Sequence, residues 1–288
     1  MADLSFLRSL LFTPADRPDR FGKACQAGAD GAILDLEDGV GLPAKDVARR
    51  EALAFFASRP SAPAGFIWAV RLNHVTTPDG LNDLLAFREA SARPSLFLLP
   101  KVESAMEIAI ATAHLARGGE SPTFMPLIES AAGLSSAEVI AGHPGVGALG
   151  FGGADLASDL NAAMAWEPLL FARSRVVQAA ACAAIPAADV PFLNIRDVDG
   201  LRGETEAAKA LGYRCKLAIH PGQIATINAV FTPTSLEVTR ARRILAAFEA
   251  AKGNALELDG KMVDAPVVNS ARRIVQLAER ADAGRSRS

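Results

Sequence analysis

The sequence predicts an α/β fold, a (β/α)8 TIM barrel with a C-terminal helical extension. Short β-type runs alternate with helical stretches, a pattern typical of right-handed βαβ units around a parallel sheet. Eight such units fit into residues 1–232 of the 288-residue chain, and a barrel of this kind takes roughly 250 residues. The turn after the first run, residues 13–16, has no glycine, which argues against a dinucleotide-binding open sheet.

Each predicted strand is a short apolar run followed by a stretch with helical character. The strands are expected at 8–14, 31–38, 66–73, 95–102, 123–130, 146–152, 187–193 and 215–221. The helices are expected at 16–27, 44–57, 80–90, 105–117, 131–141, 169–184, 200–211 and 222–230. Asp16 and Ser104 are predicted N-caps, Pro43 a first-turn proline and Gly212 a helix stop.

The pattern changes after the eighth unit, where residues 233–283 form the predicted extension. A long helix over 234–252, a β-type run over 256–263 and a last helix over 266–281 are expected there, with 284–288 as a disordered tail. This segment is too small to fold alone. We therefore expect it to pack on its own barrel or on a neighbouring subunit.

Composition narrows the class of protein. Half of the residues are hydrophobic, 22 % are charged, and the net charge is −2. No nucleic-acid partner is expected, because such a surface is strongly basic. Three scattered cysteines argue against a disulfide framework and a zinc site. Neither a signal-peptide pattern nor an apolar run long enough to span a membrane is evident, so no membrane association and a cytoplasmic location are expected.

Polar residues recur where the predicted strands end, which is where barrel enzymes carry their catalytic groups. They are Glu37 and Asp38, Arg71, Lys101, Glu129 and Asp155. From Arg71 onward the steps are 30, 28 and 26 residues, close to the roughly 30 residues of one βα unit. These side chains are expected to converge on one rim.

Glu129 and Asp155 are the predicted metal ligands. Glu129 ends an apolar strand, where an uncompensated charge is costly, and Asp155 follows a glycine-rich turn. Two carboxylates without a Cys/His set suit Mg²⁺. The alternative is that Glu129 pairs with Lys101 or Arg71 and that Asp155 caps the next helix.

Arg71 is the candidate catalytic cation, because arginine binds carboxylates and stabilises oxyanions. The alternative is a salt bridge to Glu37 or Asp38. Glu37, Asp38 and Lys101 are expected to lie behind the residues that contact the substrate and to orient them, Arg71 above all. Arg17 and Lys23 could bind phosphate groups or form a solvated helix face. His220 lies at the end of the last strand, and its position is consistent both with a role in the site and with a purely structural one.

The chain resembles the citrate lyase beta-subunit-like family within the HpcH/HpaI aldolase superfamily, over residues 8–268. The resemblance lies in the ordered set of motifs RSLLFTP at 8–14, RPDRF at 17–21, LDLED at 34–38, RLN at 71–73, PKVE at 100–103, LIES at 127–130, ADL at 154–156, AIHP at 218–221, FTP at 231–233 and GKMVDAP at 260–266.

This resemblance implies a Mg²⁺-dependent barrel that acts on CoA thioesters. It implies metal binding by Glu129 and Asp155 and contact of Arg71 with the keto acid and the enolate. The substrate-binding positions it implies are Phe12, Arg17, Lys23, Arg71, Glu129, Ala154, Asp155, Ile219 and His220. Asp264 matches an aspartate that reaches a neighbouring subunit's site in relatives, which implies a homo-oligomer, a trimer or a hexamer.

Two positions depart from the family pattern. Ala154 stands where many relatives have glutamate, which weakens the inference about the substrate. His220 stands where dedicated citrate-lyase subunits often have asparagine, which favours a free CoA thioester over a carrier-bound one.

The expected activity is retro-Claisen cleavage of a malyl-, citramalyl- or citryl-CoA type thioester to a keto acid and acetyl-CoA. The alternatives are a citrate lyase beta subunit that is active only in a complex with an acyl-carrier protein, a malate-synthase- or thioesterase-like activity, and a CoA-independent pyruvate aldolase. The Arg17/Lys23 cluster and the Asp264 segment argue against the last.

Overall fold

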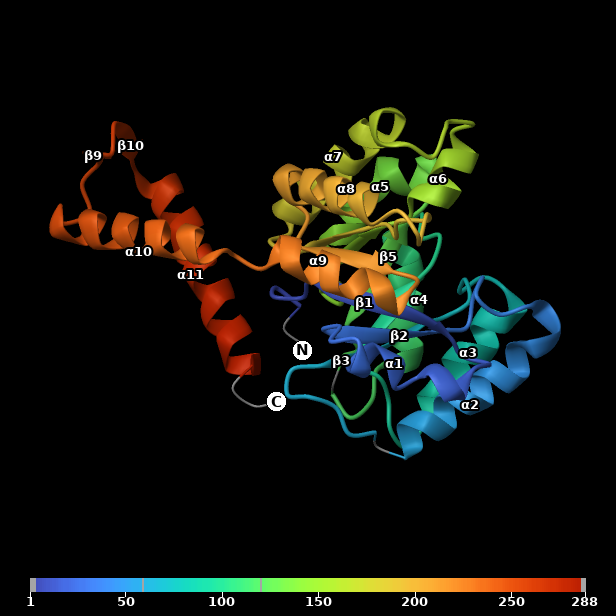
Figure 1. Cartoon of the computed structure of the whole chain (residues 1–288). Helices are drawn as coiled ribbons and strands as arrows, with labels where there is room; N and C mark the ends of the chain where they lie inside the picture. Colours follow the sequence, from blue (N-terminus) through green and yellow to red (C-terminus); the bar gives the residue numbers. More distant parts are fainter. Residues whose placement is uncertain (1–3, 59, 120, 286–288) are drawn as a thin grey trace. The chain divides into compact units, whose positions relative to one another are not determined.

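The computed structural model describes residues 4–58, 60–119 and 121–285. Eight parallel strands close into a barrel in sequence order (Figure 1). They are β1 (Ser9–Pro14), β2 (Gly31–Asp35), β3 (Ile67–Arg71), β4 (Leu96–Leu99), β5 (Phe124–Ile128), β6 (Leu149–Phe151), β7 (Ala187–Asp189) and β8 (Cys215–Ala218). Strand β8 pairs with β1 through Leu10 and Leu217, which completes the ring and confirms the predicted barrel.

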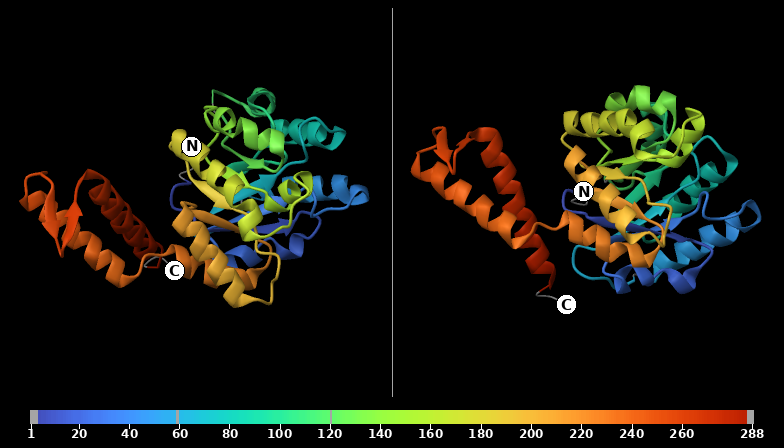
Figure 2. Two further views of the ribbon diagram at one scale, coloured as in Figure 1. Left: turned by 90° about the horizontal axis from the view of Figure 1, so that it is seen from above. Right: turned by 45° about the horizontal axis from the view of Figure 1, so that its top comes forward.

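Helices surround the barrel on its outside (Figure 2). They are α1 (Lys23–Gln26), α2 (Lys45–Ala57), α3 (Pro78–Glu89), α4 (Ala105–Leu115), α5 (Ala131–Ala141), α6 (Gly153–Asp159), α7 (Trp166–Cys182), α8 (Val198–Leu211) and α9 (Ile224–Phe231). Short 3₁₀ turns, η1 (Pro18–Arg20), η2 (Leu42–Ala44) and η3 (Pro221–Gln223), precede α1, α2 and α9. The predicted helices and strands thus appear in the predicted order.

Local signals explain the agreements and the exceptions. Ser104 forms a capping box with Glu107 at the start of α4, and Gly212 ends α8 with a φ of 123°, both as predicted. The continuous helix predicted over 16–27 is wrong: η1 and the four-residue α1 replace it, and Asp16 caps neither. Helix α6 was missed because it is short and begins in a glycine pair.

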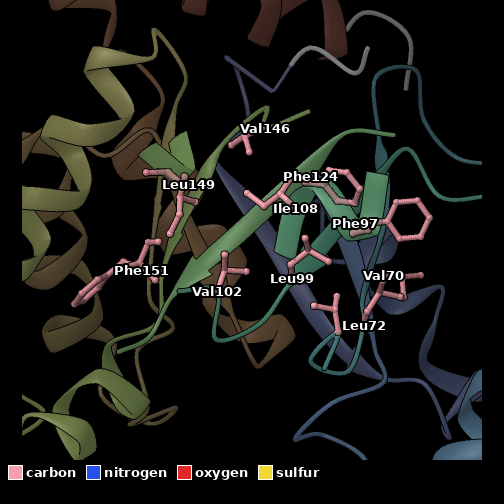
Figure 3. Close-up of a cluster of buried hydrophobic side chains, with 14 of the residues drawn as sticks. Val70, Leu72, Phe97, Leu99, Val102, Ile108, Phe124, Val146, Leu149 and Phe151 are labelled. Carbon is pink, nitrogen blue, oxygen red and sulfur yellow. The ribbon is translucent and has the colours of Figure 1, made fainter. Parts of the chain in front are cut away.

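Alternation along the strands separates two apolar layers. Leu10, Ile33, Leu98 and Leu127 belong to a cluster built almost entirely from strand residues, which fills the barrel interior. Strand residues of the opposite parity belong to a second cluster, which also includes buried helix residues such as Ile108. Figure 3 labels ten of its members: Val70, Leu72, Phe97, Leu99, Val102, Ile108, Phe124, Val146, Leu149 and Phe151. Strand parity therefore decides whether a polar residue at a strand end faces the barrel axis or the helices.

A buried ionic network lies on the helix-facing side of β7 and β8. Asp189 accepts hydrogen bonds from Arg173 of α7 at 3.1 Å and from Lys216 at 2.5 Å. Lys216 also donates to Glu204 of α8 at 2.8 Å. Asp189 and Lys216 have the parity that points away from the barrel interior, so these ion pairs join the two strands to the two helices.

The second compact unit comprises residues 229–288, so it begins four residues earlier than the predicted extension. It contains α10 (Ser235–Ala250), β9 (Leu256–Leu258), β10 (Lys261–Val263) and α11 (Ala265–Arg285). The β-type run predicted over 256–263 is a hairpin whose turn residues, Asp259 and Gly260, have φ values of 53° and 72°. Because α11 continues to Arg285, the predicted disordered tail starts inside a helix, and residues 286–288 lie outside the described residues. None of the described helices combines the length and the apolar composition that crossing a membrane requires.

The Asp189 network gives a stability prediction. Replacing Asp189 by Asn leaves Arg173 and Lys216 as buried cations with less compensation, which is expected to lower the free energy of unfolding by about 3–5 kcal/mol. Urea unfolding measures the loss. The control is Asp19→Asn, which removes an ion pair with Arg17 on the exposed surface and should leave the midpoint unchanged. Similar midpoints for both variants would show that the buried network contributes little.

Candidate active site

Four side chains at the ends of β1, β2, β3 and β5 share the parity of the barrel interior. Phe12, Asp35, Arg71 and Glu129 each follow an interior residue two positions earlier in the chain. Parallel strands end at the same side of the barrel, so these side chains gather at one rim. For Arg71 and Glu129, this is the arrangement that the spacing of the strand ends predicts.

Arg71 is held in place by two carboxylates. Its Nε and Nη2 donate to the two carboxylate oxygens of Asp35, each at 2.6 Å, and Nη1 lies 2.7 Å from Oε2 of Glu37. The guanidinium also lies 4.8 Å from the ring centroid of Phe12. Burial disfavours the charged form, but hydrogen bonding to Asp35 and the charges of Asp35, Glu37 and Glu129 outweigh it and raise the pKa of Arg71.

Glu37 bridges Arg71 to Lys101. The Lys101 ammonium lies 2.5 Å from Oε1 of Glu37 and 3.2 Å from the exposed carboxylate of Asp38. Burial raises the pKa of Glu37, while Arg71 and Lys101 act in the opposite direction. The three residues expected to orient the site thus form one ion-pair chain with Arg71.

Glu129 is 4 % exposed, and its Oε2 accepts the backbone N–H of Lys101 at 2.8 Å. Burial raises the pKa of Glu129 to about 8, and the negative charges of Glu37 and Asp155 act in the same direction. Among the described residues no side chain forms an ion pair with Glu129, so the predicted alternative of pairing with Lys101 or Arg71 is not what the structure contains. A Cβ on Gly152 would lie 2.1 Å from Cγ of Glu129, so this carboxylate requires a glycine beside it.

Asp155 lies in the first turn of α6 and is half-buried. The N-cap of α6 is Gly152, with no side-chain cap, so Asp155 does not cap the helix. Ala154 beside it is exposed. No group of three His, Cys, Asp or Glu side chains suited to a metal occurs within residues 4–58, 60–119 and 121–285. The chain therefore offers two carboxylates here, Glu129 and Asp155, rather than a complete ligand shell.

The residues predicted to contact the CoA portion follow two neighbouring strands. Arg17 and Lys23 follow β1 and are exposed, and Arg17 donates to Asp19 at 3.0 and 3.1 Å. Ile219 and His220 follow β8 and are also exposed, and Nδ1 of His220 accepts the N–H of Gly222 at 3.1 Å. Because β1 pairs with β8, both groups flank the same part of the rim.

Asp264 belongs to the second unit, between β10 and α11. It is half-buried, and its Oδ1 accepts the N–H of Val267 at 3.4 Å.

Asp35 lies two residues before Glu37 and shares its face, so the three carboxylates within residues 35–38 already indicate that cationic partners such as Arg71 are needed. The structure supplies that partner for Asp35. One buried site residue was not singled out from the sequence. Lys45, at the start of α2, donates three hydrogen bonds to residues that follow β2 and β3. Its only sequence signal is its i,i+4 spacing to Arg49, which is too common to single it out.

The comparisons with known proteins identify the family. The HpcH/HpaI aldolase/citrate lyase family profile matches residues 8–221, and the chain belongs to this family. It is 34 % identical over 284 residues to the citrate lyase subunit beta of Leuconostoc mesenteroides subsp. cremoris, covering 94 % of this chain and 93 % of the relative. It is also 34 % identical over 307 residues to the L-malyl-CoA/beta-methylmalyl-CoA lyase of Cereibacter sphaeroides, covering 94 % of each.

Solved structures are similar over the same length. CitE from Mycobacterium tuberculosis, in complex with magnesium, acetoacetate and coenzyme A, superposes with a TM-score of 0.80 at 33 % identity and covers 96 % of this chain and 99 % of its own. RipC from Yersinia pestis gives a TM-score of 0.72 at 40 % identity and covers 82 % of this chain and 100 % of its own.

The raised pKa of Glu129 predicts a pH-dependent stability. Folding raises this pKa from an ordinary 4.5 to about 8, so the folded protein retains a proton that the unfolded chain has released. The free energy of unfolding contributed by Glu129 is therefore highest below about pH 4.5 and is lost as the pH rises through about 8. Urea unfolding in EDTA between pH 5 and pH 8 should show this decrease in the wild type. The decrease should be much smaller in Glu129→Gln, and equal slopes would contradict the assignment.

Proposed function

We propose that this chain is a Mg²⁺-dependent carbon–carbon lyase that cleaves a 3-hydroxy-3-carboxyacyl-CoA thioester of the malyl-, citramalyl- or citryl-CoA type to a keto acid and acetyl-CoA. The observation that carries the proposal is the set of charged groups at the rim of the barrel. It combines an arginine fixed by Asp35 and Glu37 with a buried carboxylate, Glu129, that has no ion-pair partner among the described side chains. Relatives named as lyases of such thioesters support it.

The donor set fits a Mg²⁺ ion. The negative charge of Asp155 adds to the burial that raises the pKa of Glu129, and a cation bound by these carboxylates would relieve that repulsion. Mg²⁺ commonly takes one or two protein carboxylates and completes its shell with water and substrate oxygens. Bound there, it would supply Lewis-acid stabilisation of charge that develops on the substrate's keto-acid oxygens.

Arg71 would stabilise the enolate of the departing thioester. A guanidinium has five N–H groups. Two of them donate to Asp35 and Nη1 lies against Glu37 as an ion pair, so at least two N–H groups remain for a substrate oxygen. Their positions are fixed before the substrate arrives, which is the condition under which hydrogen bonds lower a barrier most. Phe12 packs against the guanidinium face and limits its movement.

Proton transfer completes the cleavage. A base takes the proton of the substrate hydroxyl, the bond between the hydroxyl carbon and the α-carbon breaks, and the electron pair forms the enolate. Asp264 of a neighbouring subunit would donate the proton that the α-carbon needs. Arg17, Lys23, Ile219 and His220 would hold the CoA portion, while Ala154 would line the acyl end.

A second candidate is a citrate lyase beta subunit that acts on a citryl group bound to an acyl-carrier protein. The 34 % identity to a citrate lyase subunit beta favours it. Such a subunit should be poorly active alone on free thioesters, so turnover by the isolated protein separates the two candidates.

The first test is the release of acetyl-CoA from malyl-, citramalyl- and citryl-CoA with and without Mg²⁺. One thioester should be cleaved, and both EDTA and Glu129→Ala should reduce its turnover by at least about 100-fold, because Glu129 would hold the metal and the metal would supply Lewis-acid stabilisation of developing charge. Cleavage that persists in EDTA would exclude the metal-dependent route. A folded oligomer that cleaves none of the three would favour the carrier-dependent subunit.

The proposed cross-subunit role of Asp264 can be tested by mixing subunits. Asp264→Asn and Glu129→Gln should each be nearly inactive as homo-oligomers. In co-expressed mixed oligomers, roughly a quarter of the sites would combine an intact Glu129 with an intact Asp264 from a neighbour, if the subunits assort randomly in a ring. Recovered turnover near that fraction supports the role. Full activity of Asp264→Asn alone, or no recovery in the mixture, would remove it.

A further inference from the structure

Lys45 is a buried ammonium that binds the backbone of the active-site turn. It is the first residue of α2 and is 8 % exposed. Its Nζ donates to the carbonyl oxygens of Leu36 and Glu37 and to Oδ1 of Asn73, each at 2.7 Å. An ammonium has three N–H donors, so these three acceptors saturate it. Among the described carboxylates none lies within ion-pair distance of Nζ, so charge pairing does not account for its position.

The turn that Lys45 binds is also held by Asp35. The N–H groups of Glu37 and Gly39 donate to the Asp35 carboxylate at 3.0 and 2.9 Å. A Cβ on Gly39 would lie 2.4 Å from Oδ2 of Asp35, so the turn passes as close to this carboxylate as the backbone allows. The amides of the turn are thus bound by Asp35 and two of its carbonyls by Lys45.

Helix α2 also supports the segment that follows β3, through Asp83 of α3. The side-chain amide and the backbone N–H of Asn73 donate to Oδ2 of Asp83 at 2.7 and 2.8 Å. Oδ1 of Asp83 accepts from Nε of Arg49 at 2.6 Å. Lys45 and Arg49 are four residues apart on α2, so one helical face reaches both the turn that carries Glu37 and the segment two residues beyond Arg71.

We infer that Lys45 is a positioning residue that sets the distance between Glu37 and Arg71 and so holds Arg71 where the enolate forms, an inference that rests on the proposed lyase function. Lys45 has no free donor and is buried, so it does not contact the substrate. It acts through Glu37, whose carboxylate lies 2.7 Å from Arg71 and 2.5 Å from Lys101. A movement of the turn would therefore displace both cations of the rim.

A matched control is present in the same chain. Lys216 is also a fully buried lysine at 0 % exposure, but it binds Asp189 and Glu204 on the helix-facing side of β7 and β8. Lys216→Met removes a buried ammonium without touching the rim. Any loss of activity caused only by a less stable fold should appear in this variant too.

The experiment compares Lys45→Met with Lys216→Met and the wild type. With the thioester that the wild type cleaves, Lys45→Met should lower kcat per folded molecule by about 10- to 100-fold. KM should change by less than about threefold, because Arg71 binds most strongly to the charge that develops in the transition state. Lys216→Met should keep kcat within about twofold of the wild type, whatever its stability.

Hydrogen exchange of the peptide that contains residues 37–41 provides a second readout that does not depend on activity. Its amides should exchange about tenfold faster in Lys45→Met than in the wild type and at the wild-type rate in Lys216→Met. If Lys45→Met does not fold, Lys45→Gln, which retains an amide donor, should show smaller changes in the same direction in both readouts.

The outcomes separate this inference from the proposed function. If the wild type cleaves a thioester but Lys45→Met keeps kcat within twofold, or Lys216→Met loses as much, the positioning role is overturned and the lyase assignment stands. If the wild type cleaves none of the thioesters, the proposed activity on free CoA thioesters fails. Hydrogen exchange then tests whether Lys45 fixes the turn after β2. An unchanged exchange rate at residues 37–41 overturns this role, and a faster rate that occurs only in Lys45→Met supports it.

Discussion

The ion pairs of Arg71 with Asp35 and Glu37 connect the active-site rim. They join β3 to β2, and Glu37 continues the connection to Lys101 beyond β4. The backbone N–H of Lys101 then binds Glu129 at the end of β5. The contacts join β2 to β3, β2 across β3 to the residue after β4, and β4 to β5, so four strand ends at the same end of the barrel are connected by ion pairs and hydrogen bonds into one arc. Such an arc keeps charged groups in fixed positions at little cost on binding, as electrostatic stabilisation of a transition state requires.

Charge balance distinguishes this arc from the other buried ionic network. Around Asp189, two carboxylates face two cations, Arg173 and Lys216, and the network lies outside the barrel between strands and helices. At the rim, carboxylates outnumber cations, and burial, with the charges of Glu37 and Asp155 acting in the same direction, raises the pKa of Glu129 to about 8. A buried carboxylate whose pKa is shifted in this way is typical of a functional site.

The sequence predicted the barrel and the residues of its rim for separate reasons. Short apolar runs followed by helical stretches, together with capping residues, predict the strands and helices, and α5 begins and ends at the predicted residues 131 and 141. The predicted strands are too long at their ends, because polar site residues such as Asp38 and Glu129 lie just beyond the paired segments. The composition of the segment after β1 predicts a helix, but Pro18 and Gly22 confine it to short turns.

The sequence by itself determined the class of fold and which strand ends carry charge, because alternation, spacing and turn residues are local properties of the chain. Only the tertiary structure decided how the charges pair. It bound Arg71 to Asp35 and Glu37, left Glu129 without an ion-pair partner among the described side chains, and placed Lys45 beneath the turn after β2. These choices depend on barrel closure and on burial, which bring residues from different βα units within hydrogen-bonding distance, and no local pattern in the sequence records them.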